Sequence, residues 1–177
     1  MGPAIICLIT AILTAVPVSD AISKEVRKMD KLRISSPAFE DNGSIPAKYS
    51  CDGANVNPPL VIDNVPAGTK ALALIVDDPD APVGMWVHWV MWNIEPKTGE
   101  IGEDSVPTGV QQGKNDWHRN DYGGPCPPSG THRYFFKLYA LDGALNLPAT
   151  TTKTDLEKAM DGHILAQAQI VGLYKRR

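Results

Sequence analysis

Hydrophobic positions along this chain mostly repeat every second residue, which is the period of a β-strand rather than of a helix. The run Ala71–Val76 is apolar at every position, as expected for a strand that is buried on both faces. Met85–Ile94 has two apolar faces, so it should be another central strand of the same sheet. Strict alternation assigns Trp86, His88, Val90 and Trp92 to one of its faces, and Val87, Trp89 and Met91 to the other.

Shorter patterns predict the remaining strands and turns. Alternating or aromatic-rich runs indicate strands at Leu32–Ser35 (an edge strand), Leu60–Ile62, Arg133–Leu141 and Ile164–Tyr174. The dipeptide Asn42-Gly43 is typical of a hairpin turn, and Glu95–Asp104 reads as a turn-rich hairpin connection. The long polar segment Val106–Tyr122 is expected to be a functional loop.

One segment, Thr154–His163, has the features of a helix. Thr154 is a candidate N-cap, and Glu157 follows three residues later, which together would form a capping box. Gly162 is a suitable terminator. About seven strands, long loops and one late helix favour a mainly β protein, a β-sandwich, over alternating βαβ units.

The first residues differ from the rest of the chain. Ile5–Val16 is almost wholly apolar and is followed by Pro17–Ala21, a pattern typical of a signal peptide cleaved after Ala21. The apolar run is too short for a standard transmembrane helix, and no Lys or Arg precedes it. We therefore expect a signal peptide at 1–21, a linker at 22–31 and one domain at 32–177. Export to the periplasm or medium follows if the signal peptide is genuine; otherwise the protein would be cytoplasmic.

Composition sets few further limits. The chain has 177 residues, 43% of them hydrophobic and 21% charged, which suits one globular domain with its own core. Its formal net charge of -3 gives no electrostatic reason to expect a nucleic-acid partner.

Candidate chemistry gathers where a rigid loop becomes a strand. Tyr122–Gly130 is rich in glycine and proline, so it can form neither a helix nor a central strand. His132 and Tyr134 follow it and share a face, which Phe136 and Leu138 continue as a buried face. Polar side chains at the mouth of a buried face indicate a pocket.

Three stretches resemble the phosphatidylethanolamine-binding protein family, which includes the Raf kinase inhibitor proteins. They are DPDAP at Asp78–Pro82, W-x-H at Trp86–His88 and GPCPPSGTHRY at Gly124–Tyr134. CDGANVNPPL at Cys51–Leu60 is similar to the bacterial and archaeal branch. The resemblance covers roughly Leu32 to the C-terminus. It implies an antiparallel Greek-key β-sandwich with a few short peripheral helices.

The resemblance also implies which residues form the pocket. The expected ligand-binding residues are Asp78, His88, Gly124, Pro125, His132 and Tyr134, with Asp80, Pro82, Trp86 and Cys126 in support. Imidazoles, a phenol and backbone N–H groups can all donate hydrogen bonds, which suits a phosphate or similar anion. Asp78 could orient an imidazole and favour its protonated form, a better donor to an anion. No catalytic residue, metal or cofactor is expected.

The implied function is binding of phosphate-bearing groups, such as phospholipid headgroups or phosphorylated side chains. In the family such pockets accompany inhibition of kinases or serine proteases, and an exported member would sooner meet proteases, lipids or host proteins. An alternative is a small hydrolase that uses Asp78, His88 and His132 around a metal or water. Neither a metal-ligand spacing nor an evident nucleophile supports it. A third possibility is a partner-binding domain with a vestigial pocket.

Cysteine chemistry stays open at this level. Without residues 1–21 the chain retains Cys51 and Cys126, which would be either two free thiols or one disulfide.

Overall fold

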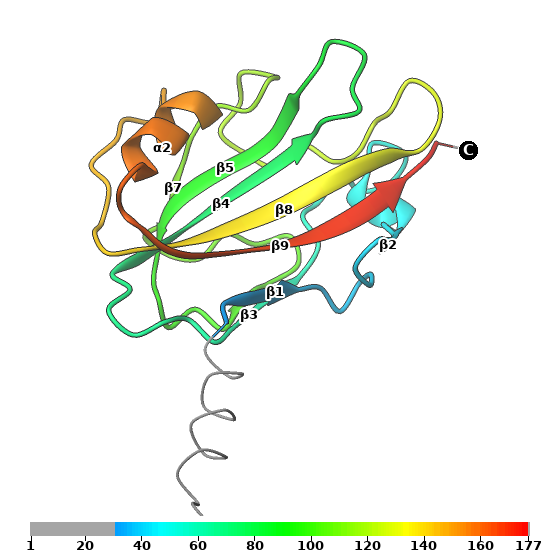
Figure 1. Cartoon of the computed structure of the whole chain (residues 1–177). Helices are drawn as coiled ribbons and strands as arrows, with labels where there is room; N and C mark the ends of the chain where they lie inside the picture. Colours follow the sequence, from blue (N-terminus) through cyan, green and yellow to red (C-terminus); the bar gives the residue numbers. More distant parts are fainter. Residues whose placement is uncertain (1–30, 177) are drawn as a thin grey trace, which may run out of the picture.

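Residues 31–176 are described by a computed structural model, in which two β-sheets pack against each other (Figure 1). The expected signal peptide, and the linker up to residue 30, lie outside the described residues. Between residues 31 and 176 no helix has the length and apolarity needed to cross a membrane.

The larger sheet has six strands in the order β2-β9-β8-β4-β5-β7. Neighbouring strands are antiparallel, except that β2 runs parallel to β9. The strands are β2 (Gly43–Ser44), β4 (Ala71–Asp78), β5 (Trp86–Ile94), β7 (Gln111–Gln112), β8 (His132–Leu141) and β9 (Ile164–Tyr174). The smaller sheet has the order β1-β3-β6, from β1 (Arg33–Ser35), β3 (Leu60–Asp63) and β6 (Glu100–Ile101). A short 3₁₀ helix, η1, spans Ala47–Tyr49.

β4 lies at the centre of the fold and is buried along its whole length. Leu72, Leu74 and Val76 face the smaller sheet and form the main core with side chains such as Ile62. The opposite face of β4 packs with Leu156 of the helix α2 (Lys153–Met160). The predictions of a mainly β sandwich, and of a strand buried on both faces, are confirmed.

Two turn predictions are wrong in their topology. Asn42 does adopt the left-handed conformation with φ 60, but Gly43–Ser44 pairs with β9 instead of forming a hairpin. The segment after β5 is not a hairpin connection either, because Glu100–Ile101 pairs with β3 in the other sheet. In both cases the turn residues were recognised, but turn chemistry alone does not specify the strand that the chain pairs with next.

The helix begins earlier than its sequence pattern indicated. Thr152 is the N-cap, and its hydroxyl and backbone N–H exchange hydrogen bonds with Asp155. This capping box replaces the predicted one of Thr154 and Glu157, two residues further along. The predicted terminator is in place, since Gly162 has φ 79 directly after the helix.

Candidate functional site

A cavity of ≈ 310 Å³ lies where β4 ends and where β5 and β8 begin. Because these strands pair antiparallel, the end of β4 lies beside the starts of β5 and β8, at one end of the strands of the larger sheet. The cavity is lined by Asp78, Ala81, Pro82, Val83, Trp86, His88, Trp117, Cys126, Pro127, Pro128, His132 and Tyr134. Seven of the ten residues expected at the site are therefore brought together; Asp80, Gly124 and Pro125 are not among those that line the cavity.

His132 and Asp78 form a buried pair across the β4–β8 ladder. In this ladder Val76 lies opposite Phe136 and Asp77 lies opposite Phe135. The next residue of β4, Asp78, is therefore close to the start of β8. The His132 Nδ1 atom lies 2.7 Å from the Asp78 Oδ2 atom. A carboxylate in this position orients the imidazole ring and favours a proton on Nδ1, so the other ring nitrogen, Nε2, is left for a ligand.

Asp80 stabilises the loop after β4 and does not line the cavity. Its carboxylate accepts hydrogen bonds from the backbone N–H of Arg133 and from the guanidinium of the same residue, at 2.7 to 3.0 Å. The Arg133 guanidinium therefore lowers the pKa of Asp80 to about 2. Asp78 Oδ1 accepts the backbone N–H of Asp80 at 2.8 Å, so the two carboxylates hold one turn.

His88 reaches the cavity because of a β-bulge in β5. Val76 pairs with Trp89 and Asp77 pairs with Val87, so His88 is an additional residue opposite β4. Trp89 consequently lies in the main core, whereas Val87 lies with Val90 on the helix side. The strict alternation expected from the sequence is therefore wrong across the bulge.

The His88 ring is held by the loop before β8. Its Nδ1 atom lies 2.6 Å from the carbonyl oxygen of Gly123. A carbonyl oxygen can only accept a hydrogen bond, so Nδ1 must carry the proton and donate it. Within residues 31–176 the other ring nitrogen has neither a hydrogen-bond partner nor full burial. Burial lowers the pKa of His88, so the neutral ring presents a lone pair at Nε2.

The Tyr134 hydroxyl is the buried polar atom of the site that has no hydrogen-bond partner among the described residues. Asp78 and the backbone of Cys126 lie beside it without a hydrogen bond of good geometry. Burial, and then the negative charge of Asp78, raise the pKa of this phenol, which therefore keeps its proton. A buried O–H group without a partner is costly, which makes it a strong donor for a ligand atom in the cavity.

Trp117 forms a wall of the cavity that sequence analysis missed. Its ring meets those of His88 and Trp86 edge to face, with centroids 5.1 and 5.3 Å away. Gly123 permits this packing, because a Cβ atom there would lie 2.4 Å from the Trp117 ring. An aromatic residue in the long polar loop Val106–Tyr122 was the available signal.

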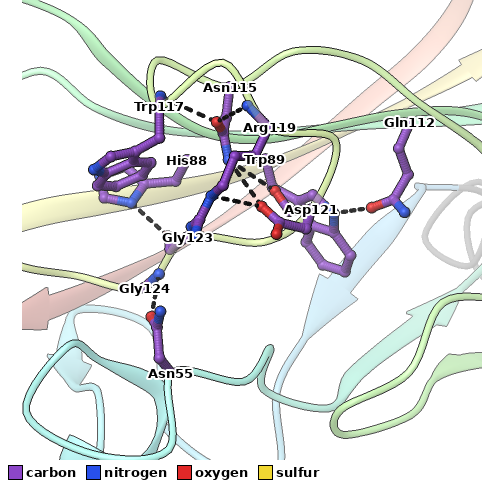
Figure 2. Close-up of polar contacts among 10 residues, drawn as sticks. All are labelled: Asn55, His88, Trp89, Gln112, Asn115, Trp117, Arg119, Asp121, Gly123 and Gly124. Carbon is purple, nitrogen blue, oxygen red and sulfur yellow. Dashed lines mark hydrogen bonds and ion pairs between the residues drawn. The ribbon is translucent and has the colours of Figure 1, made fainter. Parts of the chain in front are cut away.

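The loop that carries Trp117 is organised by Asn115 (Figure 2). The Asn115 side chain is buried; its Oδ1 accepts the backbone N–H groups of Trp117 and Arg119, both at 3.0 Å. Its Nδ2 donates to the backbone carbonyl of Asp121 at 3.0 Å. The amide thus satisfies three backbone groups and fixes the turn from which Trp117 covers His88.

Gly124 and Pro125 connect the site to the loop around Cys51. The Gly124 N–H donates to the Asn55 side chain at 2.8 Å (Figure 2), and the Pro125 carbonyl accepts from the Cys51 N–H at 3.1 Å. Cys51 and Cys126 form a disulfide with Cα atoms 5.4 Å apart, which decides between the two alternatives left open by the sequence.

The site has the composition of a small polar pocket with apolar walls. Tyr134 offers a donor, and the Nε2 atoms of His88 and His132 are free of the protein contacts that hold each Nδ1. No group of three or more His, Cys, Asp or Glu side chains within residues 31–176 is arranged to hold a metal ion.

Comparisons with known proteins agree with this fold. A sequence model of the phosphatidylethanolamine-binding protein family matches residues 35–175. A UPF0098 protein of Methanothermobacter thermautotrophicus is 49% identical over 150 residues, which covers 82% of this chain and 99% of that protein. A UPF0098 protein of Aquifex aeolicus is 48% identical over 152 residues, with 82% and 89% covered.

Solved structures show the same architecture. A putative phosphatidylethanolamine-binding protein homologue from Chlamydia trachomatis superposes with a TM-score of 0.81 at 40% identity, covering 84% of this chain and 99% of that one. The E. coli protein YbcL, a member of the mammalian PEBP family, superposes with a TM-score of 0.78 at 29% identity, covering 83% and 99%.

Proposed function

Because the chain belongs to the phosphatidylethanolamine-binding protein family, we propose that its cavity binds a small phosphate-bearing or similar anionic group. Family membership suggests a ligand-binding protein. The buried Tyr134 hydroxyl, which lacks a protein partner beside two imidazoles whose Nδ1 atoms are already held, is the observation that carries the proposal. An anionic oxygen would accept from this hydroxyl and remove the cost of its burial.

The His88 imidazole makes anion binding depend on protons. A neutral ring whose Nδ1–H is engaged presents an acceptor at Nε2, which repels an anionic oxygen. A protonated ring presents an N–H donor there instead. Anion binding should therefore favour the protonated form of His88 and take up a proton. Because burial lowers the pKa of His88, affinity should rise as the pH falls below 6.5, the ordinary value for an imidazole.

The size of the cavity limits the ligand to a headgroup. Pockets for drug-sized ligands span about 300 to 1,000 Å³, and this cavity, at ≈ 310 Å³, is at the lower end. It would hold a phosphate with a few further atoms, while acyl chains or the remainder of a phosphorylated protein stay outside. Inhibition of a kinase or serine protease would require such a partner to present its anionic group here.

The test is a titration of the histidine ring signals by NMR with phosphoserine and with phosphorylethanolamine. Saturable shifts are expected at His88 and His132, with no shift at the exposed His163, which pairs with Asp142 away from the cavity. His88→Ala should lose most of the affinity in calorimetry, and His163→Ala is the matched control. Equal affinity in both variants would remove His88 from the site.

Calorimetry in buffers with different ionisation enthalpies checks the proton linkage. The apparent binding enthalpy should vary with the buffer, because protons move from buffer to protein. The same titration with zinc tests the hydrolase alternative: line broadening at His88 and His132 with zinc, and no shift with either anion, would favour a metal site.

Export is a separate proposal that rests on the N-terminal sequence pattern. It would direct the pocket toward lipids or extracellular proteins rather than cytoplasmic kinases. The mass of the mature protein from its native host tests this, since an intact Met1–Ala21 segment would contradict cleavage.

A further inference from the structure

We infer that the Cys51–Cys126 disulfide is a thiol-exchange site whose reduction by a dithiol opens the cavity and weakens ligand binding. The inference rests on the proposed anion-binding function. Both cysteines are exposed, so a reductant can reach their sulfur atoms. Cys126 also lines the cavity, so the same bond that solvent reaches is part of the wall of the site.

The wall depends on this bond because few other interactions hold it. Cys126, Pro127 and Pro128 line the cavity from one side. Within residues 31–176, the segment 126–131 makes no hydrogen bond of good geometry to another segment. The residues on either side are held, because the Pro125 carbonyl accepts from the Cys51 N–H at 3.1 Å and the Arg133 N–H donates to Asp80 at 3.0 Å. Apart from the packing of the buried Pro127, the disulfide therefore joins residues 126–131 to the rest of the domain.

The Cys51 side of the bond is fixed independently. Ser50 is fully buried and caps η1 through its own N–H and hydroxyl, both bonded to the Ala47 carbonyl. Asp52 accepts from the Tyr174 hydroxyl at 2.8 Å and from Arg176 at 3.0 Å. When the disulfide opens, Cys51 keeps its place, and the segment that carries Cys126 gains freedom.

The exchange itself is a balanced two-electron step. One thiolate of the dithiol attacks one sulfur of the Cys51–Cys126 bond, forming a mixed disulfide and releasing the other cysteine as a thiolate, which takes a proton. The second thiol of the reductant then displaces the protein sulfur. The products are two cysteine thiols and an oxidised, cyclic disulfide of the reductant.

The effect on the ligand follows from the neighbours of Cys126. Its backbone lies beside the Tyr134 hydroxyl, and Pro127 and Pro128, which follow it, line the same cavity as His132. If the reduced wall is in place only about a fifth of the time, the apparent Kd rises about fivefold, because affinity scales with the competent fraction. The core strands lie elsewhere and should keep the domain folded.

The experiment compares phosphoserine affinity of the full chain with and without dithiothreitol, in the Cys7→Ser background so that only two thiols respond. Affinity should fall about fivefold on reduction. The Cys51→Ser/Cys126→Ser variant should bind as weakly as the reduced protein and should not respond to dithiothreitol. Equal Kd values in the oxidised and reduced proteins would overturn the inference.

A second measurement does not depend on the ligand. Amide hydrogen exchange at Gly124 and Arg133, the hydrogen-bonded amides on either side of the wall, should become faster on reduction, while exchange in β4 stays unchanged. If the oxidised protein binds no phosphoserine, the proposed function fails, and the exchange result alone then decides whether the disulfide holds the wall. Unchanged exchange at Gly124 and Arg133 would overturn that point too.

Discussion

The His132 Nδ1 atom lies 2.7 Å from the Asp78 Oδ2 atom, and both side chains are buried at the end of neighbouring strands. The contact joins two sequence motifs that are 54 residues apart. It also sets which ring nitrogen of His132 is available to a ligand. The pair therefore links the strand register of the fold to the chemistry of the cavity.

Replacing the carboxylate by an amide tests this pair. Asp78→Asn should weaken phosphoserine binding at pH 7 about tenfold, or ~1.4 kcal/mol, because a neutral amide holds the His132 Nδ1–H less firmly than a carboxylate and orients the ring less well toward the ligand. Asp142→Asn is the control, since Asp142 holds the exposed His163 in a similar contact. An unchanged affinity in Asp78→Asn would contradict this role of the carboxylate.

Protein stability should depend on the pH through His88. Burial lowers the pKa of His88 below its ordinary value of 6.5, so the unfolded chain gains this proton at a higher pH than the folded protein. The stability of the neutral form is thus fully present above pH 6.5 and is lost as the pH falls below it. The free energy of unfolding in urea should drop between pH 7.5 and 5.5 by on the order of 1 kcal/mol more in wild type than in His88→Gln. Parallel pH profiles would rule out this assignment.

The contact between Gly123 and Trp117 can be tested with a double-mutant cycle. Gly123→Ala should cost about 1–3 kcal/mol of stability, because the new methyl group overlaps the indole ring. In a Trp117→Ala background the same change should cost much less. Gly143→Ala is the control, since nothing lies within 4 Å of a Cβ there. Additive effects in urea denaturation would mean that the two residues do not interact.

The start of α2 gives a matched pair of threonines. Thr152→Ala should destabilise the protein by about 1 kcal/mol, because it removes the hydroxyl that caps the Asp155 N–H. Thr154→Ala, inside the first turn and exposed, should change stability little. Thermal denaturation of both variants distinguishes them. A larger loss of stability in Thr154→Ala than in Thr152→Ala would support Thr154 as the N-cap, as expected from the sequence.

Much of the site could be predicted from local pattern. His132 and Tyr134 share the buried face of β8 with Phe136, as the two-residue period requires. Asp78 ends a strand whose continuous apolar run already predicted burial on both faces. The position of Trp117 could not be predicted, because it depends on a loop that Asn115 organises and that lies against His88 only after folding.

The sequence by itself determined the longer strands, their buried faces outside the β5 bulge and the residue types of the pocket, because side-chain direction along a regular strand is a property of the local backbone. Tertiary structure decided the bulge that turns His88 into the cavity, the disulfide between cysteines 75 residues apart, and the pairing of β2 with β9. These features depend on which distant segments meet. Such contacts are stabilised by packing between segments that lie far apart in the sequence, so the pattern of any one segment does not specify them.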